Sequence, residues 1–293
     1  MGYGQHQSFY LRDRWLNKAI RHLKVDERFF YDKEAFEKIG LGKNMVQSLR
    51  YWVVATRVAS EEFNDERKKM YKITEFGNIL YNFDKFLQFS DTAAILHYHL
   101  TAEKEPSTAW YWFFNKYNET IINKDDLLNN FIQWVHLNES KEVSEKSLKR
   151  DIDCLIRLYI AGNNNEDPEE VIQSPIYRLN LIKETKGTVY KINGDPERIG
   201  YTALMYVLLK YREVNSIDTI SVEEIINMDG LWGKVFNMQR ASVIDALEHL
   251  TNHPFYPIRF TRTNNLDTIR IPNVDSIDFL NHEYARKVEA LKC

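Results

Sequence analysis

The stretch GLGKNMVQSLRYWVVATR, residues 40–57, decides how we interpret the fold of this chain. Its apolar side chains recur with the i, i+4, i+7, i+8 spacing of an amphipathic helix, and the predicted inward stripe consists of Met45, Leu49, Trp52 and Val53. The opposite stripe is mostly basic or amide and consists of Lys43, Gln47, Arg50, Val54 and Arg57. The pattern predicts a helix with one buried face and one outward face that carries cations.

The residue types at the start of this helix point to nucleic-acid recognition. Gly40 and Gly42 let the chain turn sharply and leave the first backbone N–H groups of the helix open to an anion. Asn44, Gln47 and Arg50 are of the types that bond to base edges and phosphates. The alternative is a plain solvated helix, because cations on an outward helix face are common in proteins of every kind.

The segments on either side of this helix predict a winged helix-turn-helix. Residues 32–40, DKEAFEKIG, predict a short helix that begins at Asp32 and ends at Gly40. Residues 68–81, KKMYKITEFGNILY, predict a strand over 70–74 and a helix over 75–81. A helix pair followed by a basic segment, a strand and a Thr-x-x-Gly turn is the order expected of that motif.

The N-terminal 25 residues form the most basic part of the chain. A helix is predicted from about Leu11, and its cations are Arg12, Arg14, Lys18, Arg21 and Lys24. The spacing His6-x-x-Phe9-x-x-Arg12 precedes it. His6 is the one candidate for a catalytic group, as a proton-transfer residue or phosphate ligand, and a structural histidine is the alternative.

Composition excludes several classes of protein. The 293 residues carry a formal charge of −3, which argues against a protein that coats nucleic acid without specificity, so any binding must come from local patches. Two cysteines support neither a disulfide framework nor a cysteine zinc site, and a reducing cytoplasm fits. No apolar run is long enough for a membrane helix or signal peptide, so we expect a soluble cytoplasmic protein. The phosphate-loop, dinucleotide and metalloprotease motifs do not occur.

Residues 91–165 predict a central helical module. Asp91 and Thr92 are credible caps for a helix that contains His97 and His99, whose rings would point apart on a helix and make a poor metal pair. The five aromatic residues at 110–114 predict a core hub, with stacking on bases as the alternative.

Helices are also predicted over residues 124–135 and 144–159, either as a second helix-turn-helix or as scaffold. On the second of them Asp151 and Asp153 diverge, and we expect Arg150 and Arg157 to neutralise them, so the pair does not indicate a nuclease metal site.

The C-terminal part repeats the winged-helix layout. The polar stretch at 161–175 is the best linker in the chain. Strands are predicted at 176–184 and 187–194, and helices at about 197–213, 221–228, 237–251 and 278–292. Residues 255–273 predict a hairpin that turns at Asn264-Asn265 and carries Arg259, Arg262 and Arg270. A basic hairpin after a helix that opens with Gln239 and Arg240 is a second candidate surface for DNA, with an ordinary surface hairpin as the alternative.

Three motifs of the N-terminal region resemble a known bacterial family. They are His6-x-x-Phe9-x-x-Arg12-x-x-Trp15-Leu16-x-Lys18, LGKNMV-x-SLRYW at 41–52, and TEFG at 74–77. The family is one of originally unassigned function from anti-phage defence islands, encoded beside sulfur transferases that resemble phosphoadenosine phosphosulfate reductase. It is represented by the B component of the single-stranded DNA phosphorothioation (Ssp) system. The resemblance implies DNA binding and, for that component, strand nicking during sulfur insertion. Gln7 stands where the family suggests an acidic residue.

The sequence as a whole predicts a mainly α (α+β) protein of tandem winged helix-turn-helix modules with small β-hairpin wings, divided into 1–90, 91–165 and 176–293. The residues expected to contact DNA are Arg12, Lys18, Lys43, Asn44, Gln47, Arg50, Arg57, Arg240, Arg259 and Arg262. No resident metal site is predicted, and a divalent metal such as magnesium enters only if the chain is a DNA nicking endonuclease. Expected partners are DNA and, from the resemblance, sulfur-transfer enzymes and other defence components. A non-catalytic interaction scaffold and a winged-helix transcriptional regulator are the alternatives.

Overall fold

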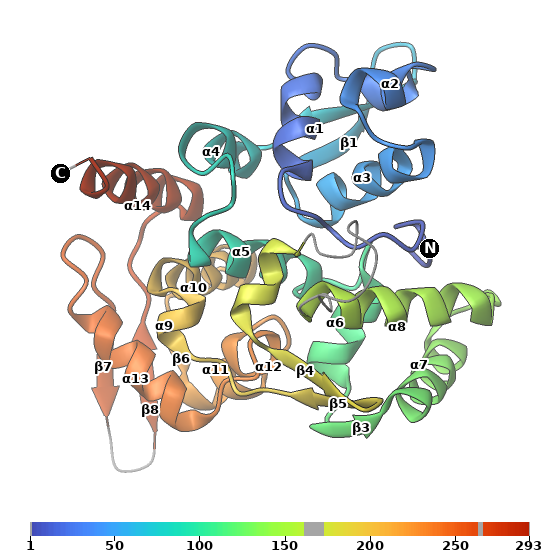
Figure 1. Cartoon of the computed structure of the whole chain (residues 1–293). Helices are drawn as coiled ribbons and strands as arrows, with labels where there is room; N and C mark the ends of the chain where they lie inside the picture. The colour runs from blue at the N-terminus through green and yellow to red at the C-terminus, as the bar shows by residue number, and fades with distance from the viewer. Residues whose placement is uncertain (1, 161–172, 263–265, 293) are drawn as a thin grey trace.

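Helices dominate the chain, and its strands form three small antiparallel sheets in the part that the structure describes (Figure 1). The structure is a computed structural model that describes residues 2–160, 173–262 and 266–292. The predicted class, mainly α with small hairpins, is confirmed at this level. None of the described helices combines the length and the apolar content that a membrane span requires.

The N-terminal region contains the helices and the hairpin in the predicted order. Its elements are α1 (Trp15–Leu23), the 3-10 helix η1 (Phe29–Tyr31), α2 (Ala35–Ile39), α3 (Lys43–Ala55), β1 (Ala59–Phe63), β2 (Lys69–Ile73) and α4 (Glu75–Phe83). Gly40 ends α2 with a φ of 66°, a conformation that favours glycine. Thr74 caps α4 by accepting a hydrogen bond from the Gly77 N–H at 3.0 Å, which accounts for the Thr-x-x-Gly turn.

Strand β1 is an addition to the predicted elements. It pairs antiparallel with β2, with Ala59 opposite Ile73 and Phe63 opposite Lys69. Its sequence ASEEF shows no apolar alternation along a buried face. The pairing with β2, rather than a pattern of its own, makes this segment a strand.

The inward face of α3 is broader than the predicted stripe. Three of the four predicted positions are buried, namely Leu49, Trp52 and Val53. Met45 is only half-buried, and Val46 takes the inward position instead. The N-terminal segment covers a second side of the helix, because Ser48 Oγ and Trp52 Nε1 donate to the Phe9 carbonyl at 3.2 and 3.0 Å. α3 is therefore enclosed on two sides and open on its polar side.

The central region forms the core of the molecule. Its elements are α5 (Ser90–Thr101), α6 (Thr108–Tyr111), the π-helix η2 (Trp112–Lys116), β3 (Ile121–Asn123), α7 (Lys124–Asn138) and α8 (Glu145–Tyr159). The aromatic hub is confirmed, because Trp110, Trp112, Phe113 and Phe114 are no more than 2% exposed. His97 is a structural residue whose Nδ1 lies 2.6 Å from the Tyr159 hydroxyl and whose Nε2 lies 2.6 Å from the Val235 carbonyl oxygen.

The C-terminal region carries two of the sheets. Its elements are η3 (Pro175–Leu179), β4 (Ile182–Thr185), β5 (Thr188–Lys191), α9 (Pro196–Ile199), α10 (Tyr201–Asn215), β6 (Thr219–Ser221), α11 (Val222–Asn227), α12 (Trp232–Val235), α13 (Arg240–Thr251), β7 (Arg259–Arg262), β8 (Asp267–Arg270) and α14 (Ser276–Ala290). The strand order of one sheet is β3-β5-β4, and that of the other is β6-β8-β7. The predicted hairpin is confirmed as β7 and β8, and its Asn264-Asn265 turn lies outside the described residues.

Three predictions for this part of the chain need correction. The strand predicted over 176–184 begins only at Ile182, because Pro175 starts a 3-10 turn in which the Ser174 Oγ accepts from the Ile176 N–H. The helix predicted over 197–213 is broken at Gly200, which has a φ of 96°. The helix predicted over 237–251 begins only at Arg240, and a separate short helix, α12, precedes it.

The C-terminal helix contacts both the N-terminal and the C-terminal region. α14 packs against both α4 and α10 (Figure 1). Asp91 does not cap its own helix as predicted; its Oδ1 accepts the Ala203 N–H at the start of α10 at 3.0 Å, and its Oδ2 pairs with Lys287 of α14. A Cβ at Gly200 would lie 2.1 Å from Asp91 Oδ1, so this approach requires glycine.

Candidate nucleic-acid interface

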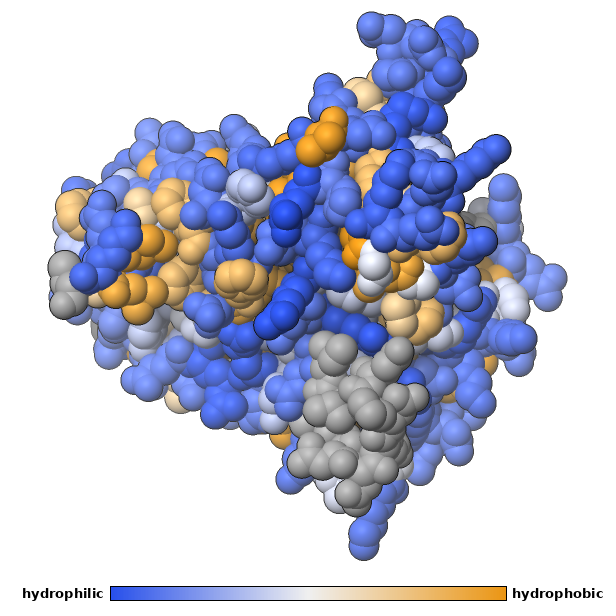
Figure 2. Space-filling model, turned by 45° about the horizontal axis from the view of Figure 1, so that its top comes forward, coloured by the Kyte–Doolittle hydropathy of each residue, from blue (hydrophilic) through white to orange (hydrophobic). Residues whose placement is uncertain are grey.

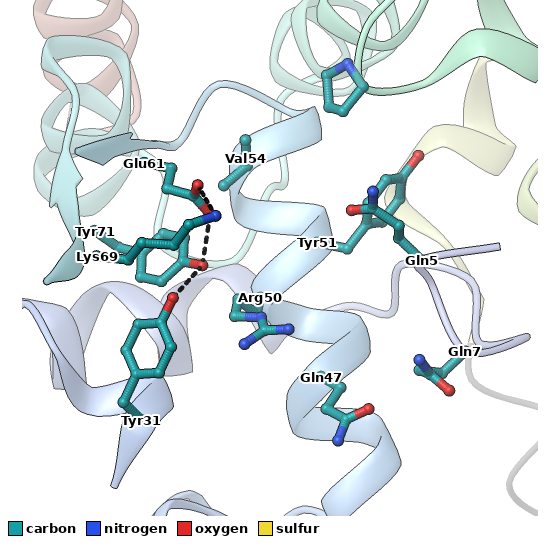
Figure 3. Close-up of a pocket in the computed structure, with 11 residues that line it drawn as sticks. Gln5, Gln7, Tyr31, Gln47, Arg50, Tyr51, Val54, Glu61, Lys69 and Tyr71 are labelled. Atoms are coloured by element: carbon teal, nitrogen blue, oxygen red, sulfur yellow. Dashed lines mark hydrogen bonds and ion pairs between the residues drawn. The ribbon is translucent and has the colours of Figure 1, made fainter. Parts of the chain in front are cut away.

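The polar side of α3 is the floor of a pocket. Lys43, Asn44 and Gln47 are exposed, and Arg50 and Val54 are half-buried. The pocket has a volume of about 360 Å³ and is lined by Gln5, Gln7, Tyr31, Gln47, Arg50, Tyr51, Val54, Glu61, Lys69, Tyr71 and Pro106 (Figure 3). Figure 2, in which the N-terminal region is turned forward, shows a mostly hydrophilic surface with small separate apolar areas. The predicted recognition face therefore lies in a polar hollow rather than against the core.

One wall of the pocket is the hairpin. Lys69 Nζ lies 2.5 Å from Glu61 Oε1, and the Tyr71 hydroxyl donates to Glu61 Oε2 at 2.9 Å (Figure 3). The Tyr31 hydroxyl lies 3.4 Å from that of Tyr71 and extends the network to η1. Burial alone would raise the pKa of Glu61, but the hydrogen bonds from Lys69 and Tyr71 outweigh it and lower the pKa. This wall is therefore a fixed network around a charged carboxylate.

The opposite wall is the N-terminal loop, which is held by a buried pair. His6 is fully buried and its Nε2 lies 2.7 Å from Oδ1 of Asp151 on α8. The same oxygen accepts the Gly4 N–H at 2.9 Å, and His6 Nδ1 accepts the Ser8 N–H at 3.1 Å. Nδ1 can accept only through a lone pair, so the Nε2 proton is the one donated to Asp151.

Burial and the neighbouring groups act on the pKa of His6 in opposite directions. Burial disfavours the imidazolium, yet Cys154 and Asp151 outweigh it and raise the pKa of His6 to about 10. A raised pKa favours the imidazolium at neutral pH, whereas the Ser8 N–H requires the lone pair of an unprotonated Nδ1; we assign the neutral ring because the hydrogen-bond geometry requires it. With both ring nitrogens engaged and no exposed surface, His6 anchors the loop. We therefore assign it no catalytic role.

The predicted DNA-contact residues near α3 fall into two groups. Lys43 and Arg50 make no ion pair among the described residues; their charged groups lie 4.8 Å from the Phe36 ring centre and 5.9 Å from the Tyr31 ring centre, and the charge of Arg50 helps to lower the pKa of Glu61. Lys18 and Arg57 are engaged elsewhere. Lys18 Nζ donates to the Ile39 carbonyl at the end of α2 at 3.1 Å, and Arg57 pairs with Glu103 at 2.5 Å.

Arg12 lies away from this surface. Its side chain is buried, with an exposed fraction of 9% for the residue, and its guanidinium lies within 6 Å of three ring centres, those of Phe9, Tyr10 and Trp15. A cation in this position stabilises the packing of the N-terminal segment. It cannot reach a phosphate unless the segment opens.

Two of the three arginines predicted to contact DNA in the C-terminal region are paired with carboxylates. Arg240 pairs with Glu223 and, at 3.1 Å, with Asp267, and Arg262 pairs with Glu248 at 2.7 Å. Arg259 is exposed on β7 and has no ion-pair partner in the described part of the chain. Only one of the three predicted arginines is therefore an unpaired cation.

Several residues of the pocket were not predicted from the sequence. Gln5 and Gln7 come from the loop ahead of α1, Tyr31 from η1, and Glu61 and Tyr71 from the hairpin. Lys69 belongs to the basic segment of the predicted motif but was not singled out as a contact residue. The others carry no signal of their own, because only the fold brings these segments together.

The acidic side chains of α8 do not form a metal pair. Asp151 is buried against His6, whereas Asp153 lies on the surface and pairs with Lys124 at 2.8 Å. Their divergence is as predicted, and the charge of Arg150 favours the ionised form of Asp151 as expected, while the direct contacts of the two carboxylates are with His6 and Lys124. Among residues 2–160, 173–262 and 266–292, no group of three or more His, Cys, Asp or Glu side chains is placed to hold a metal ion.

The fold is shared with solved structures of SspB. A magnesium ion-bound SspB structure is 21% identical and has a TM-score of 0.87, with 98% of this chain and 87% of that chain covered. A second SspB structure is 20% identical with a TM-score of 0.85, and the match covers 99% of this chain and 94% of that chain. No curated protein matches. The resemblance expected from the N-terminal motifs is thus confirmed for the fold.

Family membership follows from a match along nearly the whole length. The model of the family described as "Protein of unknown function (DUF4007)" matches residues 3–284. This range includes the pocket over α3, the central core and most of α14. The chain belongs to the DUF4007 family.

Proposed function

We propose that this protein is a DNA-binding component of a phosphorothioation-linked anti-phage defence system, and that residues 1–90 bind DNA as a winged helix-turn-helix. The observation that carries the proposal is the open polar face of α3, where Lys43 and Arg50 have no carboxylate partner among the described residues. Unpaired cations at a concave surface are available to phosphates, whereas paired ones must first give up a partner. The shared fold with SspB supports the placement in such a system.

The start of α3 offers a second contact for an anion. Gly42 is its N-cap residue and makes no side-chain capping hydrogen bond. The first N–H groups of the 13-residue helix thus lack a capping side chain at the end where the helix dipole is positive. Lys43 and Asn44 are exposed beside them. A backbone phosphate at this end would place Gln47 toward the bases and leave Arg50 for a neighbouring phosphate.

The hairpin is proposed to position DNA rather than attract it. Lys69 pairs with Glu61, and Lys72 pairs with Glu62 at 2.9 Å, so these lysines of β2 are balanced by glutamates of β1. A balanced hairpin adds little long-range attraction. Its contribution is the wall that it forms beside α3.

The scaffold alternative loses its main surface. That alternative assigns partner binding to the aromatic segment 110–117 together with the C-terminal helix. The largest side chains of that segment are in the core, and α14 packs against α4 and α10. We therefore favour DNA over protein as the primary partner, with sulfur-transfer enzymes as further partners of the complex. The division into 1–90, 91–165 and 176–293 stays a prediction.

Strand nicking remains a proposal taken from the resemblance alone. Magnesium is bound in one SspB structure, but the described residues of this chain form no acidic or histidine cluster that fits such an ion. No reaction step is therefore assigned here. Supercoiled plasmid incubated with a divalent metal tests the activity; relaxed circles that disappear with EDTA would support an intrinsic nickase.

The DNA-binding proposal is tested by the salt dependence of affinity. A labelled plain duplex is titrated with the protein at several salt concentrations, and binding is followed by fluorescence anisotropy. The logarithm of the affinity should fall steeply with the logarithm of salt, by about 0.9 for each phosphate contact. No measurable affinity even at low salt would refute the proposal.

A further inference from the structure

Three kinds of side chain line the pocket over α3, namely amides, aromatic rings and cations. Three glutamines, Gln5, Gln7 and Gln47, supply amides that can both donate and accept. Tyrosine rings form part of the walls, and Arg50 and Lys69 supply cations. Amides and aromatic rings are the groups with which proteins hold a nucleobase outside its stack.

The size of the pocket suits one nucleotide. Its volume of about 360 Å³ is at the lower end of the range for sites that enclose small ligands, roughly 300–1,000 Å³. A double helix is far too wide to enter. A group of the size of one phosphate or one base fits the pocket, whereas a base pair does not.

The charge distribution distinguishes a base from a phosphate. Glu61 is part of the lining and is held as a carboxylate by Lys69 and Tyr71. A phosphate inside the pocket would meet this negative charge, whereas a neutral base would not. Arg50 makes no ion pair among the described residues, although its charge helps to lower the pKa of Glu61, and its guanidinium is available to the flanking phosphates.

The walls are held in place before any ligand arrives. The His6–Asp151 pair fixes the loop that carries Gln5 and Gln7, and the network of Tyr31, Tyr71, Glu61 and Lys69 fixes the hairpin side (Figure 3). Such preorganisation lowers the entropy lost on binding. Tyr31 is 39% exposed, and Arg28, Arg50 and the stacked ring of Tyr71 lie 4.9, 5.9 and 6.0 Å from its ring centre, so a base would stack on the ring area that these neighbours leave open.

We infer that this pocket receives one unstacked nucleobase from DNA bound along α3, with the base against the ring of Tyr31 and its polar edge toward the glutamine amides. The inference rests on the proposed DNA-binding function and deepens it. It assigns the protein a preference for DNA in which one base is unpaired over fully paired DNA.

Three labelled duplexes of one sequence test this inference. The first is fully paired, the second carries one extra unpaired nucleotide at its centre, and the third carries the same extra nucleotide without its base. The wild-type protein should bind the second about tenfold more tightly than the third, as expected of one base stacked on an aromatic ring. Equal affinity for the second and third duplexes, at a salt concentration where both bind, would overturn the inference and leave the proposed function standing.

Three variants show whether Tyr31 is responsible. Tyr31→Ala should reduce the affinity ratio of the second to the third duplex to about one, whereas Tyr31→Phe keeps the ring and should keep the ratio. Tyr81→Ala is the matched control, because Tyr81 is also partly exposed with lysines near its ring, 4.2 and 4.7 Å away, and does not line the pocket. A ratio that survives in Tyr31→Ala would overturn the inference. If the wild-type protein bound none of the three duplexes, both the proposed function and this inference would be refuted.

Discussion

The face of α3 and the face of the β7–β8 hairpin look alike in sequence and differ in their charge partners. Both follow a helix-rich segment, and both carry two or three cations with amides nearby. At α3, Lys43 and Arg50 have no carboxylate partner among the described residues. At the second face, Arg240 of α13 contacts two carboxylates and Arg262 of β7 contacts one, whereas Arg259 and Arg270 of the hairpin make no ion pair among the described residues.

This difference shows that a basic motif is not yet a basic surface. Exposed ion pairs stabilise a fold by little, but each one removes a cation from the set that a phosphate can bind without competition. Glu223, Glu248 and Asp267 come from three different segments, and the fold places them beside the arginines. We therefore expect α3 to dominate DNA binding and the second hairpin to contribute weakly.

Reversing the charges of the two faces should give the largest effect. Lys43→Glu combined with Arg50→Glu removes two cations and adds two anions, so we expect DNA affinity to fall by about 100-fold near 0.1 M salt. Arg240→Glu combined with Arg262→Glu should lower it by less than about threefold. Anisotropy titrations measure both, and thermal melts confirm that each variant is folded. A larger loss of DNA affinity in the Arg240→Glu, Arg262→Glu variant than in the Lys43→Glu, Arg50→Glu variant would contradict the comparison.

Lowering the pH should reduce the stability of the core that both faces share, but it should not reduce the DNA affinity of the α3 face. Burial lowers the pKa of His97 to about 3, whereas the unfolded chain has a value of about 6.5. Because the unfolded chain binds the proton first, the stability linked to neutral His97 is complete above the unfolded pKa and is lost as the pH falls toward 3. From about pH 6.5 to about pH 5 the contribution of His97 to the free energy of unfolding should fall by about 2 kcal/mol, in addition to that of His99, whose pKa burial also lowers to about 3.

Urea unfolding at the two pH values checks this expectation, with His97→Gln as the variant that lacks the titrating group. A smaller pH dependence in the variant is the predicted result, and an equal one would remove His97 from the account. DNA affinity of the folded wild type should stay constant over the same range, because lysine and arginine keep their charge there.

Two buried tyrosines, one on α3 and one on α14, differ in whether their hydroxyl groups have a hydrogen-bond partner. The Tyr284 hydroxyl on α14 lies 2.7 Å from Thr92 Oγ1, whereas the hydroxyl of Tyr51, a residue of α3, has no hydrogen-bond partner in the described chain. Tyr284→Phe should lower the free energy of unfolding by about 1 kcal/mol. Tyr51→Phe removes an unsatisfied buried group and should leave stability unchanged or raise it by up to about 1 kcal/mol. Urea denaturation of both variants decides, and a clear loss for Tyr51→Phe would indicate a partner that this structure does not show.

Freeing the second hairpin should have the smallest effect. Glu223→Gln combined with Asp267→Asn removes both partners of Arg240. If ion pairing is what limits this face, affinity for plain duplex should rise by about threefold. Unchanged affinity would mean that the hairpin does not approach DNA at all. Glu248→Gln, which frees Arg262 instead, is the companion variant.

The structural features that were predicted correctly from the sequence are those set by residues close together in the chain. The periodicity of 43–55, the left-handed Gly40 and the cap at Thr74 are local signals, and the helices and the second strand of the hairpin follow from them. Charged β1 lacks such a signal, because only its pairing with β2 makes it a strand.

What the sequence could not predict depends on contacts between distant segments. His6 meets Asp151 across 145 residues, and Arg12 is enclosed by the rings of its own folded segment. Their exposed or buried state decides whether they can bind a ligand. Motif spacing carries no information about it, which is why both were predicted as functional and lie in the interior.

The salt dependence of four single variants tests the central claim most directly. For Lys43→Ala and Arg50→Ala, the slope of log affinity against log salt should shrink by about 0.9 each, as expected when one phosphate contact is lost. For Arg240→Ala and Arg262→Ala the slope should equal that of the wild type. Unchanged slopes at α3 together with reduced slopes at the second hairpin would contradict the account.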